Sequence, residues 1–147
     1  MEDKLMGFKA GLAAACSAAA AFLGWQGVMA LVWVTVMGLD YLSGSAAACK
    51  AGQWSSAVAR AGLWHKGGMI LVVCAAFLGD CVMAVMCANL PLQMDWCGAI
   101  VPLVLGWYIL TELGSILENA VKMGANVPGW LVKLLKAGLD AVENQGQ

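Results

Sequence analysis

Charged residues are scarce in this chain of 147 residues. Lys, Arg, Asp and Glu make up 12% of the sequence, whereas soluble domains carry about 25%. Apolar residues make up 62%, and the mean hydropathy is +0.80. So few charges cannot cover the surface of a soluble globule, and the composition therefore predicts a lipid bilayer as the solvent. The formal net charge of −1 also argues against binding to nucleic acid.

Several long stretches lack charge altogether, namely 10–39, 67–79, 81–94 and 96–111. A membrane-spanning helix needs about 20 mostly apolar residues, because the hydrocarbon layer is roughly 30 Å thick. We therefore expect an all-α polytopic membrane protein that forms one domain over 1–147. Its three spanning helices are expected at about 14–38, 68–90 and 97–117. The first is too long and too rich in Ala for a cleaved signal peptide, and two more spans follow it.

The distribution of Lys and Arg predicts the orientation of these spans. The segment 41–66 and the tail after the third span each carry three cations, whereas the turn at 91–95 carries none. Because cytoplasmic loops are enriched in Lys and Arg, we expect both basic segments in the cytoplasm. This orientation places the N-terminus outside and the C-terminus inside.

Metal-binding and catalytic motifs are missing. The six cysteines include no CxxC pair, and His65 is the single histidine, whereas zinc sites need closely spaced thiolates. Most of the cysteines fall within expected spans, where a thiol behaves as a small hydrophobic group. Cys97, beside the outer turn, is the one that we expect to be exposed. There is also no nucleophile–base set and no phosphate-binding loop, so we expect no cofactor, no metal and no enzymatic activity.

The first expected span is rich in small residues. These recur at every fourth position in two ladders, Ala10, Ala14 and Ala18, and Ala13, Ser17 and Ala21. Small residues at this spacing let helix backbones approach closely. The ladders therefore indicate either an oligomerisation face or a packing seam within one chain.

Asp80 is the one acid inside the second expected span. A charge at the bilayer centre costs roughly 2.5–3.5 kcal/mol on insertion scales, so it normally faces a partner or a water-filled cavity. Two interpretations remain open. Asp80 is either a lumen-facing or assembly-gating acid, or a hydrogen-bonded structural acid within the bundle.

Two further helices are expected outside the spans. Ser55 and Ser56 suit the N-cap of a short helix on the cytoplasmic surface before span two. Asn126 and Pro128 suit the start of an amphipathic helix at about 128–144. Its apolar face carries Leu131, Leu134, Leu135, Leu139 and Val142, and its polar face carries Lys133, Lys136, Asp140 and Glu143. This helix either lies on the membrane surface or packs against copies of itself.

Polar residues gather at the end of the third span. Glu112, Ser115 and Asn119 share one face of the helix and form a polar stripe. Glu118 precedes Lys122 by four residues, the favoured order for an ion pair on a helix.

Acids near a helix C-terminus are disfavoured by the helix dipole, by about 0.3–1 kcal/mol. A partner should therefore offset the charge on these carboxylates. The alternatives are Lys122, Lys66, Arg60 or a subunit interface. Gly124 and Asn126 are then suited to end the helix.

The same residues carry a family resemblance. The pattern Glu112–x–x–Ser115–Ile116–Leu117–Glu118–Asn119, followed by Gly124 and Pro128, resembles the toxin-secretion/phage-lysis holin family. The upstream pattern also resembles this family, and it consists of Asp40, Gly44, a serine at 55 or 56, Gly62, Lys66 and Asp80. The resemblance covers about 35–140 and leaves out the Ala-rich first span and the cysteines.

The resemblance implies a phage- or prophage-encoded protein that accumulates in the host cytoplasmic membrane. Such proteins form homo-oligomers and open lesions through which an endolysin passes, although some relatives export a toxin instead. The pore-lining or assembly candidates are Asp40, Lys66, Asp80, Glu112, Ser115, Glu118, Asn119 and Lys122, and the helix-packing candidates are Ala14, Ser17, Ala18 and Ala21. The alternatives are a small transporter in which Asp80 and Glu112 titrate, and an antiholin-type regulatory protein.

Overall fold

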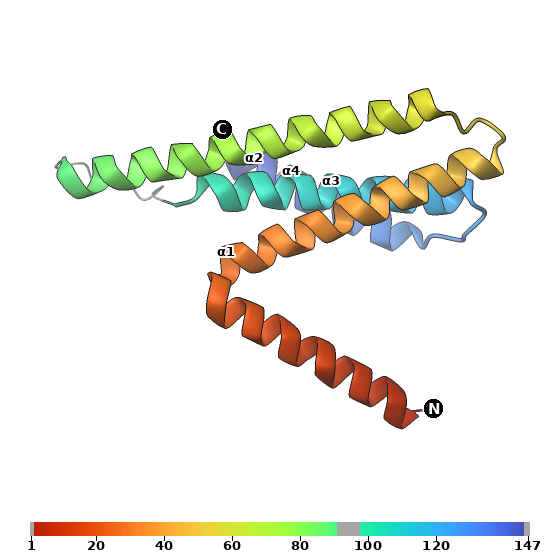
Figure 1. Ribbon diagram of the computed structural model, residues 1–147, viewed down its shortest axis with the longest axis horizontal. Helices are drawn as coiled ribbons and strands as arrows, with labels where there is room; N and C mark the ends of the chain where they lie inside the picture. The colour runs from red at the N-terminus through yellow and green to blue at the C-terminus, as the bar shows by residue number, and fades with distance from the viewer. Residues whose placement is uncertain (1, 91–97, 146–147) are drawn as a thin grey trace.

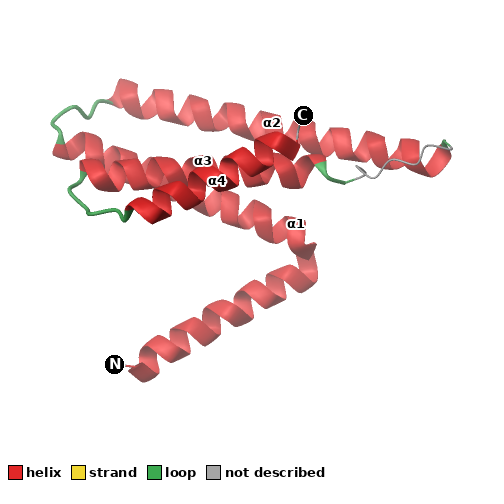
Figure 2. Ribbon diagram, turned by 180° about the vertical axis from the view of Figure 1, so that it is seen from behind, coloured by secondary structure: helices red, strands yellow, loops and turns green. Residues whose placement is uncertain are grey.

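The computed structural model describes residues 2–90 and 98–145, and all its regular secondary structure there is helical. The helices are α1 (Glu2–Lys50), α2 (Ser56–Asn89), α3 (Ile100–Lys122) and α4 (Gly129–Gln145). The second part of α1 runs beside α2 and α3 (Figure 1), and α4 lies against α3 (Figure 2). Three segments, Gly24–Lys50, α2 and α3, are long and apolar enough to cross a membrane. The chain is therefore an all-α integral membrane protein, as the sequence predicted.

α1 bends sharply at Gly24, where φ is 71° and ψ is 174°. Glycine adopts this left-handed φ without a steric penalty, and the bend directs the N-terminal part of α1 away from the other helices (Figure 1). The apolar helix that packs in the bundle therefore covers Gly24–Lys50 instead of the expected 14–38. The small residues Ala14, Ser17, Ala18 and Ala21 lie on the projecting part and are exposed within the chain.

α1 and α3 end in the same way, at a glycine with positive φ. The φ angle is 65° at Gly52 and 95° at Gly124. In each case three backbone N–H groups bond back to carbonyls of the last turn, which satisfies groups that the helix end leaves free. The prediction that Gly124 helps to end the third span is confirmed. Between Gly24 and Gly52 no glycine has a positive φ, and α1 continues through 39–50.

We expect Gly124→Ala to lower the free energy of unfolding by about 1–2 kcal/mol, because a Cβ atom is disfavoured at this φ. The added Cβ would also lie 3.2 Å from Nζ of Lys50, which donates a hydrogen bond to the Met123 carbonyl. Unfolding of the purified protein by SDS in mixed micelles measures the change. Gly129→Ala is the matched control, because a Cβ there meets no atom within 4 Å. Equal stabilities of the two variants would contradict the role of Gly124 at the end of α3.

α2 begins at the expected cap. The Ser55 Oγ accepts a hydrogen bond from the Val58 N–H at 3.2 Å. The expected surface helix and the second span are, however, one continuous helix of 34 residues. Gly67 and Gly68 keep ordinary helical φ values, so they do not separate the two segments. At 1.5 Å per residue α2 is about 50 Å long, and its ends therefore extend beyond a hydrocarbon layer of about 30 Å.

α3 is the central helix and packs against each of the other three. The buried core consists of Trp33 and Met37 from α1, Met69 from α2 and Leu105 from α3. The ring of Trp33 stacks on Tyr108 with centroids 6.2 Å apart. These contacts hold the polar residues of the three candidate spans in register.

α4 folds back along α3, which corrects the expectation that its apolar face meets only lipid or other copies. A Cβ atom on Gly138 would lie 3.3 Å from a methyl group of Leu110, and a Cβ atom on Gly106 would lie 4.0 Å from Val142. The Trp107 indole N–H also donates a hydrogen bond to Glu143 at 3.2 Å. The short loop at 123–128 reverses the chain, so the apolar face of α4 reaches α3 of the same chain first.

Candidate functional site

A polar network joins the three candidate spans at one level. The Lys66 Nζ of α2 lies 3.0 Å from Oδ2 of Asp40 on α1 and 2.6 Å from Oε2 of Glu112 on α3. The Asn119 side-chain N–H₂ donates to the other oxygen of Asp40 and to the Ser43 hydroxyl, at 3.1 Å each. The Ser43 hydroxyl in turn donates to the Asp40 carbonyl at 3.0 Å. One ammonium group therefore bridges carboxylates from two other helices.

The helices position this network by a shared spacing. Asp40, Lys66 and Glu112 each lie ten residues from the end of their helix, on the side of the 51–55 and 123–128 loops. The three groups therefore meet at the same depth, about 15 Å from those ends. Gly44 leaves room for the network, since a Cβ atom there would lie 3.4 Å from the Asn119 amide nitrogen.

The network is shielded from the surroundings. The exposed fractions of the side chains are 5% for Glu112, 13% for Lys66 and 20% for Asp40. It holds two carboxylates and one ammonium group, so its formal charge is −1. Removing one member of a buried ion pair leaves an unpaired charge and typically costs about 3–5 kcal/mol, so these contacts restrain the relative positions of the three helices. Lys66 is therefore the residue that offsets the charge of Glu112.

The structure separates the polar residues predicted on α3 into two sets. Glu112 and Asn119 face the network, whereas Ser115, Glu118 and Lys122 line a groove between α3 and α4. The predicted Glu118–Lys122 ion pair is wrong, because no ion pair joins these two residues in the described part of the chain. Both side chains are exposed, and such a pair contributes only about 0.2–0.5 kcal/mol on a helix surface.

Ser43 is the member of the network that the sequence did not indicate. It follows Asp40 by three residues, so both lie on the same face of α1. This three-residue spacing is the feature of the sequence that could have indicated Ser43. It becomes informative only once the position of Asn119 on α3 is known.

Asp80 caps the start of α3. Its two carboxylate oxygens accept hydrogen bonds from the backbone N–H groups of Ile100 and Val101, at 3.1 and 2.8 Å. No side chain of the N-cap residue itself does this. A carboxylate at a helix N-terminus is stabilised by free N–H groups and by the helix dipole. This geometry corresponds to the structural interpretation of Asp80 and places its carboxylate at the first turn of α3.

The cysteines differ in state. Cys49, Cys74 and Cys81 are free thiols, whereas Cys87, close to the end of α2, is disulfide-bonded. The expectation that the span cysteines are all simple hydrophobic groups is therefore wrong for Cys87, because spacing alone does not reveal pairing. Cys97 lies outside the described residues. Among the described residues, no group of three His, Cys, Asp or Glu side chains is arranged to hold a metal ion.

Comparison with known proteins gives one match. The family model of the bacteriophage holin family matches residues 17–139, which include most of α1 and α4 and the whole of α2 and α3. No curated protein and no solved structure matches the chain. The matched region contains every residue of the polar network and the Asp80 cap. The chain therefore belongs to the bacteriophage holin family.

Proposed function

We propose that this chain is a holin, which oligomerises in the host cytoplasmic membrane and opens holes that release an endolysin or, as in some relatives, a toxin. The observation that carries the proposal is the family match, which extends across all three candidate spans. The polar network is consistent with it. Asp40, Lys66 and Glu112 satisfy one another inside the bundle, so a single chain can lie in the membrane without exposing them to lipid.

The proposed orientation has the N-terminus outside and the C-terminus in the cytoplasm. The cations support it, because the loops at 51–55 and 123–128 adjoin helix ends that carry Lys50 and Lys122. The disulfide at Cys87 also supports it. Cys87 lies at the opposite end of the bundle, and disulfides persist on the oxidising side of the membrane.

The test is induced expression in bacteria, with and without a co-expressed endolysin. We expect an abrupt loss of membrane potential in both cultures, and lysis only in the culture that contains the endolysin. Solute-specific flux without depolarisation would favour a transporter. Insertion into the membrane without loss of potential, together with delayed lysis by a second holin, would favour an antiholin.

A further inference from the structure

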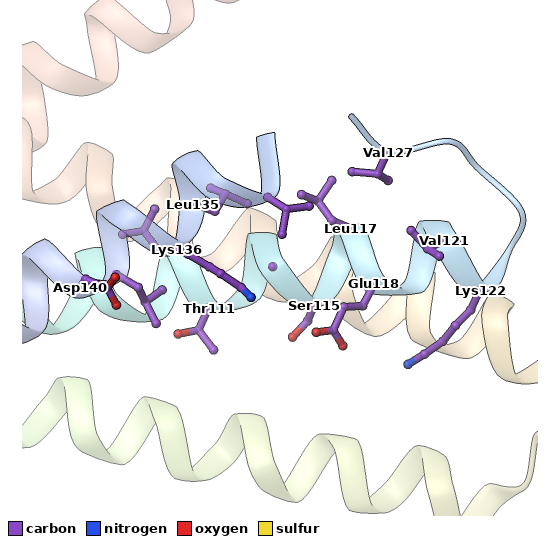
Figure 3. Close-up of a pocket in the computed structure, with 14 residues that line it drawn as sticks. Thr111, Ser115, Leu117, Glu118, Val121, Lys122, Val127, Leu135, Lys136 and Asp140 are labelled. Carbon is purple, nitrogen blue, oxygen red and sulfur yellow. The ribbon is translucent and has the colours of Figure 1, made fainter. Parts of the chain in front are cut away.

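The groove between α3 and α4 has a volume of about 680 Å³. Leu117, Val121, Val127 and Leu135 lie toward one side of it (Figure 3). Polar side chains lie along its other edge, namely Thr111, Ser115, Glu118 and Lys122 of α3, and Lys136 and Asp140 of α4 (Figure 3). One side of the groove is therefore apolar and the other is polar.

The polar edge results from helical spacing. The α3 members recur at intervals of four, three and four residues, which places them on one face of the helix. Because α4 runs antiparallel to α3, Lys136 and Asp140 continue the same line beyond Ser115. We name Glu118, Lys122, Lys136 and Asp140 the charged band. Along it the order is Lys122, Glu118, Lys136, Asp140, so the charge alternates in sign.

The charged band has no partner among the residues that the structure describes. All four side chains are exposed, and none forms an ion pair or hydrogen bond with another described residue. This distinguishes them from Asp40, Lys66 and Glu112, which are paired across the bundle, and from Glu143, which accepts a hydrogen bond from Trp107. Two cations and two carboxylates thus remain unsatisfied on one face.

The depth of α4 makes this exposure costly. Its contacts with Leu110 and Gly106 bring it back along most of α3, which is itself a candidate span. Lys136 and Asp140 therefore lie alongside the span, where charges are rare on surfaces that face lipid and normally pair with other charges or face water. The charged band of a second copy also carries two cations and two carboxylates. The two bands can therefore pair with each other and leave no net charge.

We propose that the charged band is the surface by which one copy of this chain docks on another. The inference rests on the proposed holin function and names the contact through which the copies assemble. It assigns assembly to the α3–α4 face and not to the small residues of the projecting part of α1.

The test uses two variants of opposite charge. Lys122→Glu with Lys136→Glu makes the band wholly acidic, and Glu118→Lys with Asp140→Lys makes it wholly basic. We expect each variant alone to lose at least ten-fold in chemically cross-linked oligomers within the membrane, because like charges then face one another. Co-expression of the two variants should restore the oligomers and membrane depolarisation, since an acidic band then meets a basic one.

The matched control for the acidic variant is Arg60→Glu with Lys133→Glu. These two residues are exposed and lie outside the groove, and the change in net charge is the same. We expect this control to assemble like the wild type. Wild-type assembly by the acidic or the basic variant alone would overturn the proposal, and so would a co-expressed pair that stays monomeric.

A second measurement does not depend on the folding of charge variants. A photo-cross-linking amino acid at Ser115, beside the band, should give protein dimers. The same group at Leu71, on the exposed face of α2, should give mainly lipid adducts. Lipid adducts alone at Ser115 would overturn the proposal. A wild-type chain that dimerises through Ser115 but never depolarises the membrane would instead refute the holin function and leave the band intact.

Discussion

Replacing Lys66 by Met should lower the free energy of unfolding by about 3–5 kcal/mol, the usual cost of removing one partner from a buried ion pair. Lys66 is the only cation within 4 Å of Asp40 or Glu112 in the described part of the chain. Its loss leaves two carboxylates in a shielded site between three helices. Unfolding by SDS in mixed micelles, followed by circular dichroism, measures the difference.

A variant in which the whole network is uncharged distinguishes the effect of lost packing from the effect of an unpaired buried charge. In the triple variant Lys66→Met, Asp40→Asn and Glu112→Gln, no charge remains to be satisfied, so we expect most of the lost stability to return. Lys133→Met is the matched control, since Lys133 is exposed and outside the network. A triple variant as unstable as Lys66→Met would show that the ion pairs are not the cause of the loss.

Asp80→Ala should have the second largest effect, a loss of about 2 kcal/mol, because it removes the acceptor for two N–H groups at the start of α3. Asp80→Asn should recover part of this loss, since its amide oxygen still accepts one hydrogen bond while the charge at the helix dipole is gone.

Hydrogen exchange of the backbone amides in the first turn of α3 measures the local effect of losing the Asp80 cap. We expect faster exchange at Ile100 and Val101 in Asp80→Ala, with the turns around Asn119 unchanged. Uniform acceleration along all of α3, or none at Ile100, would contradict the capping role. The same variant in cells tests whether the Asp80 cap also influences the time of lysis.

Local features of the fold were predictable from the sequence because they depend on nearby residues. The charge-free runs indicated the number of spans, and Ser55 and Gly124 indicated where α2 begins and α3 ends. The bend at Gly24 was not predictable. A glycine within an apolar run fits a straight helix equally well, so the sequence alone does not reveal the positive φ.

The sequence indicated most residues of the polar network but not Ser43, and it left the partner of Glu112 open among several alternatives. Asp40, Lys66, Glu112 and Asn119 were all candidates, yet their contacts depend on how α1, α2 and α3 are aligned. For Glu118 the sequence favoured Lys122, four residues away, and the structure forms no such pair. The energy of a helical surface pair is small enough for side-chain entropy to override it.

Release of encapsulated solutes from lipid vesicles tests the holin function most directly. The purified full chain is reconstituted at increasing density into vesicles that contain a small fluorescent dye together with a dextran the size of an endolysin. We predict that both leave together and abruptly once the chain exceeds a threshold density. Escape of the dye alone, at a rate simply proportional to the amount of protein, would contradict the formation of holes and favour a transporter.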